Sequence, residues 1–123
     1  MKIDHLVLTV KDVNKTVDFY TRFMGFEKEV FLEGRVALKF EGGKINLHAY
    51  GNEFEPKAET PMPGSADLCF IAKEKIEEIM LRFIREGINI IEGPVPRTGS
   101  NGKINSFYFR DPDHNLIEVS NYI

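Results

Sequence analysis

The fold is decided by the segment IDHLVLTVKDVNKTVDFYTRFMG, which spans residues 3–25. Residues 3–10 are apolar and rich in β-branched side chains, which predicts a strand. Apolar residues then recur at helical spacing, which predicts a helix. Asp12 or Asn14 can accept hydrogen bonds from the free amides at the helix start, and Gly25 lies where a left-handed residue commonly ends a helix. The segment is therefore a strand followed by a helix.

Three short strand-like runs follow this helix, at residues 26–33, 34–40 and 44–50. They are separated by turn-forming glycines, as expected for adjoining antiparallel strands. Residues 51–65 contain three prolines and two glycines without periodicity, which is typical of a linker on the surface. The predicted order is strand, helix, strand, strand, strand.

The same order starts again after the linker. A strand is predicted at 66–72 and a helix at 75–86, and His5 matches Asp67 at the constant offset of 62 residues that also matches Gly25 to Gly87. The three remaining strands are expected at residues 88–93, 105–110 and 115–122. The Gly/Pro-rich stretch between the first two of these, residues 94–102, is predicted to be a loop and a candidate lid.

We therefore predict one α+β domain over residues 1–123, built from two tandem βαβββ modules. The first module covers about residues 1–50, the linker about 51–65 and the second module about 66–122. Each helix needs an apolar sheet face to cover, so the modules are expected to form a curved mixed sheet around a cup that binds a metal.

Composition narrows the class of function. With 42% hydrophobic and 28% charged residues the chain is an ordinary globular sequence. The net charge of −3 and the absence of a basic run argue against nucleic acid, and no long apolar segment indicates a membrane span. No secretory signal pattern follows Met1, so a cytoplasmic location is expected. Cys69, the single cysteine, is interpreted as a core residue.

Four polar residues stand at equivalent strand positions of the two repeats, opposite the apolar side chains of four predicted strands. Because alternate residues of a strand face opposite sides, His5, His48, Asp67 and Glu118 are expected on the face that no helix covers. Each alone is more often a solvated strand residue, but their joint placement predicts a metal site. Nitrogen and carboxylate ligands without a thiolate suit Zn, Ni, Co, Mn or Fe.

These features resemble the vicinal oxygen chelate superfamily, also called the glyoxalase, bleomycin resistance and dioxygenase group. The resemblance covers the whole chain and rests on HLVLTVKD (5–12), TVDFYTRFMGFE (16–27) and FYFRDPDHNLIEV (107–119). The subgroup it is most similar to is the glyoxalase domain-containing protein 5 type, through KINLH (44–48), PGSADLC (63–69) and IEVSNY (117–122). Other members generally have histidine at the position of Asp67, and glycine is usual at His114.

The resemblance implies a glyoxalase-like fold and a divalent metal held by His5, His48, Asp67 and Glu118. It also implies a lactoylglutathione lyase-like enzyme that acts by metal-assisted proton abstraction next to a carbonyl, with Glu118 as base and Asp67 as ligand or second base. The alternatives are an Fe(II) dioxygenase of the ring-cleaving type and a metal-free drug-binding protein of the bleomycin-resistance type. Metal, substrate and reaction stay open at this point.

The substrate is expected to be a small molecule bound in a homodimer, as the resemblance implies. Basic candidates for an anionic group are Arg35, Arg97, Lys103 and Arg110. Aromatic candidates for lining the cup are Phe40, Tyr50, Phe107 and Tyr108. How the modules pair in a dimer is not decided by the sequence.

Overall fold

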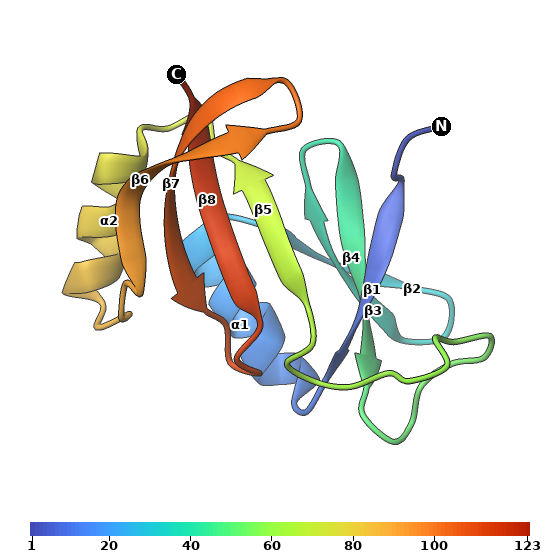
Figure 1. The fold of residues 1–123 in the computed structure, drawn as a ribbon. Coiled ribbons are helices and arrows are strands. Elements are labelled where there is room, and N and C mark those ends of the chain that lie inside the picture. The colour runs from blue at the N-terminus through green and yellow to red at the C-terminus, as the bar shows by residue number, and fades with distance from the viewer. The chain divides into compact units, whose positions relative to one another are not determined.

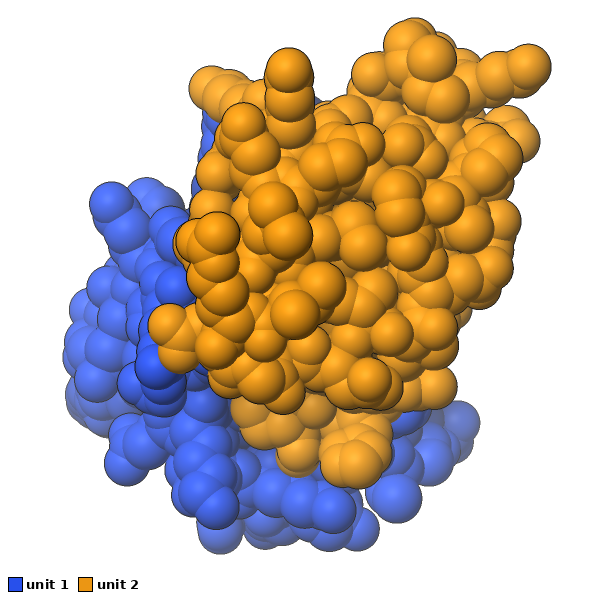
Figure 2. Space-filling view, turned by 90° about the vertical axis from the view of Figure 1, so that its left-hand side faces the viewer, with its two compact units in different colours: residues 1–66 blue, residues 67–123 orange.

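The computed structural model describes residues 1–123, which form two compact units. Unit 1 is Met1–Ala66 and unit 2 is Asp67–Ile123. Figure 1 traces the chain through both units, and Figure 2 colours their surfaces separately. The elements of each unit follow the order strand, helix, strand, strand, strand, so the predicted duplication of a βαβββ module is confirmed.

Unit 1 contains one four-stranded mixed sheet and one helix (Figure 1). Its elements are β1 (His5–Val10), α1 (Val13–Met24), β2 (Glu27–Phe31), β3 (Arg35–Phe40) and β4 (Gly43–Ala49). The spatial order is β1-β4-β3-β2, in which β1 and β4 are parallel and the other pairs are antiparallel. The parallel pair is possible because α1 and two further strands connect β1 to β4.

Helix α1 begins and ends where its sequence predicts. The Asp12 carboxylate accepts a hydrogen bond from the Lys15 backbone amide at 3.0 Å, which satisfies one of the free donors of the first turn. Gly25 follows the helix with φ of 70°, in the left-handed region. The helix covers one face of the sheet, where Tyr20, Leu38 and Ile45 are completely buried.

Unit 2 repeats this arrangement with its own sheet, helix and core (Figure 1). Its elements are β5 (Asp67–Ile71), α2 (Ile76–Arg85), β6 (Glu92–Gly99), β7 (Gly102–Arg110) and β8 (Leu116–Tyr122). The spatial order is β5-β8-β7-β6, again with one parallel pair, β5 and β8. Phe83 of α2 packs edge-on against Phe107 and Phe109, with ring centroids 5.6 and 5.0 Å apart. These buried rings hold α2 to the sheet.

The prediction for the segment after α2 was wrong. Residues 88–91 are not in a strand, and β6 instead occupies much of the stretch that was predicted as a loop and lid. Gly93 has φ of 131° and lies at a register shift between Glu92 and Val95. This shift interrupts the alternation of a regular strand, so the sequence of β6 does not show a strand pattern. Pro94 and Pro96 are tolerated because β6 is an edge strand.

The two four-stranded mixed sheets with one helix each give the α+β arrangement of two βαβββ modules that was predicted. Neither α1 nor α2 has the length and apolar character that a membrane-crossing helix needs.

Candidate functional site

The predicted site residues lie on the helix-free face of each sheet, meaning the face opposite the unit's own helix. In unit 1, strand alternation and pairing place His5, Asn46 and His48 on this face. In unit 2 the same reasoning places Asp67, Cys69 and Glu118 there. The expected side of each sheet is therefore the observed one.

The strand register corrects the predicted correspondence between the modules. His5 pairs with Lys44 and Asp67 pairs with Leu116, so the residue two positions further on is Asn46 in β4 and Glu118 in β8. His48 therefore corresponds to Ser120. The prediction that His48 and Glu118 are equivalent was wrong, because an alternating pattern does not reveal a slip of two residues.

His5 and His48 lie on one face but at different ends of the β1–β4 pair. The partner of His48 is Thr9, four residues along from His5, which is about 13 Å at the usual rise of a strand. The two imidazoles also have different neighbours, Asp4 for His5 and Phe54 for His48. Unit 1 alone does not bring its two predicted histidine ligands together.

The imidazole of His5 is oriented by Asp4. His5 Nδ1 and Asp4 Oδ2 are 2.9 Å apart, and this hydrogen bond is the main reason why the pKa of Asp4 is lowered. A proton on Nδ1 leaves Nε2 with a free lone pair. Metal-binding histidines in proteins are commonly held by a carboxylate in this way.

Asn46 carries an unpaired oxygen between the two histidines. Its Oδ1 is buried and has no hydrogen-bond partner. Such an atom costs free energy and is rare in native proteins. Asn46 was not predicted as a site residue, although the same alternation places it on the face of His5.

His48 is nearly buried, with 8% of its surface exposed. Its ring meets the Phe54 ring edge-on, with centroids 5.5 Å apart. Burial lowers the pKa of His48, and the charge of Arg35 lowers it further, while Glu53 acts in the opposite direction. The neutral imidazole is therefore the favoured form in the folded protein.

Glu118 is the centre of a hydrogen-bonded group in unit 2. Ser106 Oγ donates to Glu118 Oε2 at 2.6 Å, and Ser120 Oγ donates to the same oxygen at 3.3 Å. The two serine hydroxyls are themselves 2.6 Å apart and completely buried. Because both serines engage Oε2, the carboxylate is fixed in orientation while Oε1 is not used by them. These serines were missed, although both lie at alternate positions of predicted strands.

Tyr108 connects Glu118 to a cation. Burial and a hydrogen bond with Glu118 raise the pKa of Tyr108. Arg97 Nε donates to Tyr108 Oη at 3.0 Å, which raises the pKa of Arg97, and the guanidinium also lies 3.2 Å from Glu92. Tyr108 and Arg97 are thus the two predicted substrate residues that lie with Glu118.

Cys69 and Asp67 complete the group on the helix-free face of unit 2. Cys69 is exposed there, so its interpretation as a core residue was wrong. Cys69 pairs with Glu118 across the strands, and its Sγ lies 3.4 Å from Ser120 Oγ. Lost hydration at the sulfur raises the Cys69 pKa, and the charges of Glu118 and Asp67 add to this effect. Asp67 itself is exposed and lies two residues from Cys69.

The other predicted substrate residues are dispersed. Phe107 is completely buried under α2, so its ring belongs to the core of unit 2. Tyr50 is exposed and its hydroxyl lies 3.8 Å from the sulfur of Met62. Lys103 is exposed at the start of β7, and Arg110 donates to the backbone oxygen of His114 at 3.4 Å.

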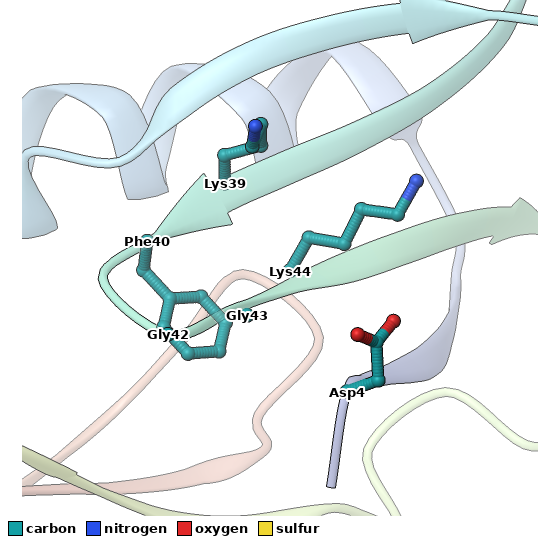
Figure 3. A pocket seen from close by; sticks show the side chains of 6 residues that line it. All are labelled: Asp4, Lys39, Phe40, Gly42, Gly43 and Lys44. Carbon is teal, nitrogen blue, oxygen red and sulfur yellow. The ribbon is translucent and has the colours of Figure 1, made fainter.

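A pocket of about 330 Å³ lies at the β3–β4 turn of unit 1, near His5 (Figure 3). Its lining residues are Asp4, Lys39, Phe40, Gly42, Gly43 and Lys44. A side chain at position 43 would begin 2.8 Å from the backbone oxygen of Asp4, so glycine allows this close approach. Phe40 is the one predicted lining residue found in this pocket, and the pocket contains none of the four predicted metal ligands.

The candidate ligands have donor atoms of the types that bind a divalent metal. His5 has a free imidazole nitrogen, Asn46 has an unpaired oxygen, and Glu118 has an oxygen outside its serine contacts. These are the hard and intermediate donors that Zn, Ni, Co, Mn and Fe(II) accept. No group of three such side chains is assembled at one place in the structure.

Comparison with known proteins agrees with this fold. A family model for the Glyoxalase/Bleomycin resistance protein/Dioxygenase superfamily matches residues 2–119. Virulence protein STM3117 of Salmonella typhimurium is 53% identical over 99% of this chain and 85% of its own. Its crystal structure aligns with a TM-score of 0.98 over 100% of this chain and 98% of that one.

Two further proteins extend this similarity. Glyoxalase domain-containing protein RDO1 of Mycosarcoma maydis is 53% identical over 98% of this chain and 68% of its own. The crystal structure of lactoylglutathione lyase from Agrobacterium tumefaciens is 25% identical, with a TM-score of 0.73 over 98% of this chain and 92% of that one. Members of this group typically use divalent metals. The chain belongs to the Glyoxalase/Bleomycin resistance protein/Dioxygenase superfamily.

Proposed function

We propose that the protein is a metal-dependent lyase or isomerase of the glyoxalase type. It removes a proton from a carbon next to a carbonyl of a small substrate that offers adjacent oxygens. The observation that carries this proposal is the fixed carboxylate of Glu118, which accepts from two serines on one oxygen only. A carboxylate held in this way is suited to general base chemistry.

The proposed metal ligands are His5, Asp67 and Glu118, with a fourth ligand from β4. His48 is the fourth ligand expected from the sequence, and Asn46 is the residue that the register makes equivalent to Glu118. The ion, when bound, supplies positive charge that stabilises a developing oxyanion.

Each residue near Glu118 has a defined part in the proposed proton transfer. Glu118 takes the proton, and Asp67 is the second candidate because it is exposed on the same face. Ser106 and Ser120 hold the Glu118 carboxylate in one orientation. Tyr108, held by Arg97, is placed to donate a hydrogen bond to the carboxylate or to an oxygen of the substrate.

Metal content is the first test. Elemental analysis of untagged protein should find about one ion per chain, and His5→Ala and Glu118→Ala should lose it, because each removes a ligand. Asn46→Ala and His48→Ala are compared directly, and the variant that loses metal identifies the ligand from β4. Arg22→Ala, on the surface of α1, is the control. A wild-type protein that takes up no ion after incubation with Zn, Ni, Co, Mn or Fe(II) contradicts the proposal and favours the drug-binding alternative.

Activity separates the enzyme classes. The metal-loaded protein is tested on the hemithioacetal of methylglyoxal and glutathione, and on other small α-hydroxycarbonyl compounds, by following proton exchange with deuterated water. Glu118→Gln should reduce exchange by about 100-fold or more, the usual contribution of a positioned base. Oxygen consumption with Fe(II) and a catechol would instead favour the dioxygenase.

We also propose that the active form is a homodimer in the cytoplasm. Members of this superfamily usually act as dimers on small molecules. Light scattering after size-exclusion chromatography measures the mass directly, and the mass of a single 14.1 kDa chain would contradict the dimer.

A further inference from the structure

A second polar group lies on the helix-free face of unit 1, at the end away from His5. The register pairs Val36 with Leu47, so Arg35 lies across from His48, and His48 pairs with Thr9 on its other side. The Arg35 guanidinium stacks over the Phe54 ring with 4.0 Å between its Cζ and the ring centroid. Phe54 comes from the segment that follows β4 and also contacts the edge of His48.

Arg35 differs from the other cations of this face because it has no carboxylate partner. Lys39 and Lys44 both lie near Glu29, at 3.7 and 3.5 Å. Glu53, whose charge acts on His48, is already engaged by the Gly51 amide at 2.7 Å and by Lys57 at 3.7 Å. Arg35 therefore leaves one positive charge uncompensated at this end of the sheet.

His48 and Thr9 add polar atoms without partners beside this charge. His48 is nine-tenths buried, and its ring contacts the ring of Phe54. The charges of Arg35 and Glu53 act on it, but no side chain or backbone atom hydrogen-bonds to its imidazole. An unpaired imidazole in such a position is a donor that a ligand can use.

We propose that Arg35, His48 and Phe54 form a binding site for the carboxylate of a small organic acid. Stacking on Phe54 holds the guanidinium flat while its edge keeps the paired donors that match a carboxylate. His48 adds one N–H donor, and Thr9 is its partner across the strands. One positive charge neutralises a monoanion, whereas a phosphate dianion would keep an uncompensated negative charge beside the largely buried His48. The site contains neither His5 nor Glu118, and it shares only His48 with the candidate metal ligands.

The test uses benzoate as the probe and benzyl alcohol as its neutral counterpart. Chemical shifts of the full-length protein are followed by two-dimensional NMR during titration at neutral pH. Benzoate should shift the amide signals of Arg35, His48 and Phe54 and saturate at millimolar concentration, and benzyl alcohol should not. Arg35→Gln should weaken benzoate binding at least tenfold, since it removes the charge and the paired donors.

Lys39→Gln is the matched control, because Lys39 lies on the same strand and face but has Glu29 as its partner. It should leave benzoate binding unchanged. If both substitutions weaken benzoate binding equally, the binding depends only on the overall charge and the proposed site is overturned. Benzoate binding that survives Arg35→Gln would also overturn it. So would inorganic phosphate that binds more tightly than benzoate. If Arg35→Gln does not fold, Phe54→Leu provides the same comparison, with weaker binding expected.

Metal analysis of the same variants separates this site from the proposed function. Arg35→Gln should keep the metal content of the wild type while losing benzoate binding. Loss of metal in His48→Ala together with undiminished benzoate binding would assign His48 to the metal and remove it from this site. A wild-type protein without metal that still binds benzoate at Arg35 would leave the carboxylate site standing and the metal proposal overturned.

Discussion

Asn46 and Glu118 occupy the same register position in the two modules, but only Glu118 is surrounded by hydrogen-bond donors. Two serines donate to the Glu118 carboxylate, whereas Asn46 Oδ1 is buried without a partner. Because the two strand pairs have one geometry, this difference comes from the side chains around each position. Position 106 is a serine, while the corresponding position in β3 is Arg35, which turns to Phe54.

We expect Asn46→Val to raise the free energy of unfolding by about 1 kcal/mol, because it removes a buried polar atom that has no partner. Valine also suits a strand. Urea unfolding of the metal-free protein measures the change. A loss of stability of similar size would mean that the amide makes a hydrogen bond in solution.

Ser106→Ala should lower the free energy of unfolding by about 1 to 2 kcal/mol. The substitution removes hydrogen bonds to Glu118 and to Ser120 at a completely buried position. Urea unfolding at neutral pH gives the value, and Ser65→Ala in the exposed linker is the control. A change within a few tenths of a kcal/mol would show that water replaces the serine hydroxyl.

The free energy of unfolding should fall as the pH is lowered below about 6.5. The pKa of His48 is lower in the folded protein than in the unfolded chain, so the unfolded chain binds the proton first. This contribution is fully present above the unfolded pKa and is lost as the pH decreases. Urea unfolding between pH 7.5 and pH 5.5 measures the slope.

His48→Gln should reduce this slope. His114→Asn is the control for it, because His114 is exposed in a turn with φ of 67°, a conformation that asparagine tolerates. An unchanged slope in His48→Gln would assign the pH dependence to other groups.

Glu118→Gln should make Cys69 react faster with iodoacetamide at pH 8. Lost hydration raises the pKa of Cys69, and the neighbouring charge of Glu118 raises it further, so removing that charge increases the fraction of thiolate. Glu92→Gln lies on the same sheet but pairs with Arg97, and it should leave the alkylation rate unchanged. Mass spectrometry at timed intervals measures both rates.

Gly93→Ala should destabilise unit 2 by about 3 kcal/mol or more, because a Cβ there would lie 2.5 Å from the Phe107 Cβ and the residue has φ of 131°. Gly51→Ala isolates the cost of backbone conformation, since Gly51 has φ of 87° and open space around it. It should cost about 1 kcal/mol. Equal losses in thermal unfolding would show that the contact with Phe107 relaxes freely.

Local patterns in the sequence predicted the repeated strand and helix of each module. Asp12 and Gly25 mark the ends of α1 through hydrogen bonding and backbone conformation, which depend on neighbouring residues alone. The sequence also identified the face that carries His5 and Glu118, because alternation is a property of a single strand. The predictions that succeeded thus depended on short stretches of chain.

The prediction failed where pairing between strands decides the structure. The equivalence of His48 and Glu118 was wrong because register is set by the partner strand, and Asn46 and His48 are both polar and point the same way. Strand β6 was missed because Pro94 and Pro96 argue against a strand unless its place at the sheet edge is known. Ser106 and Ser120 lie at alternate positions of predicted strands, but only the pairing of β7 with β8 brings both hydroxyls to Glu118.

The two prolines of β6 also protect the protein from association through its sheet edges. An exposed edge strand can recruit a strand from another chain, and continued recruitment leads to aggregates and amyloid. Pro94 and Pro96 remove two amide donors from the eight residues of β6, so an incoming strand meets an incomplete row of hydrogen-bonding groups. Replacing both with valine or threonine would complete that row. The edge of the sheet beside the residues of the candidate site could then pair with a strand of another chain.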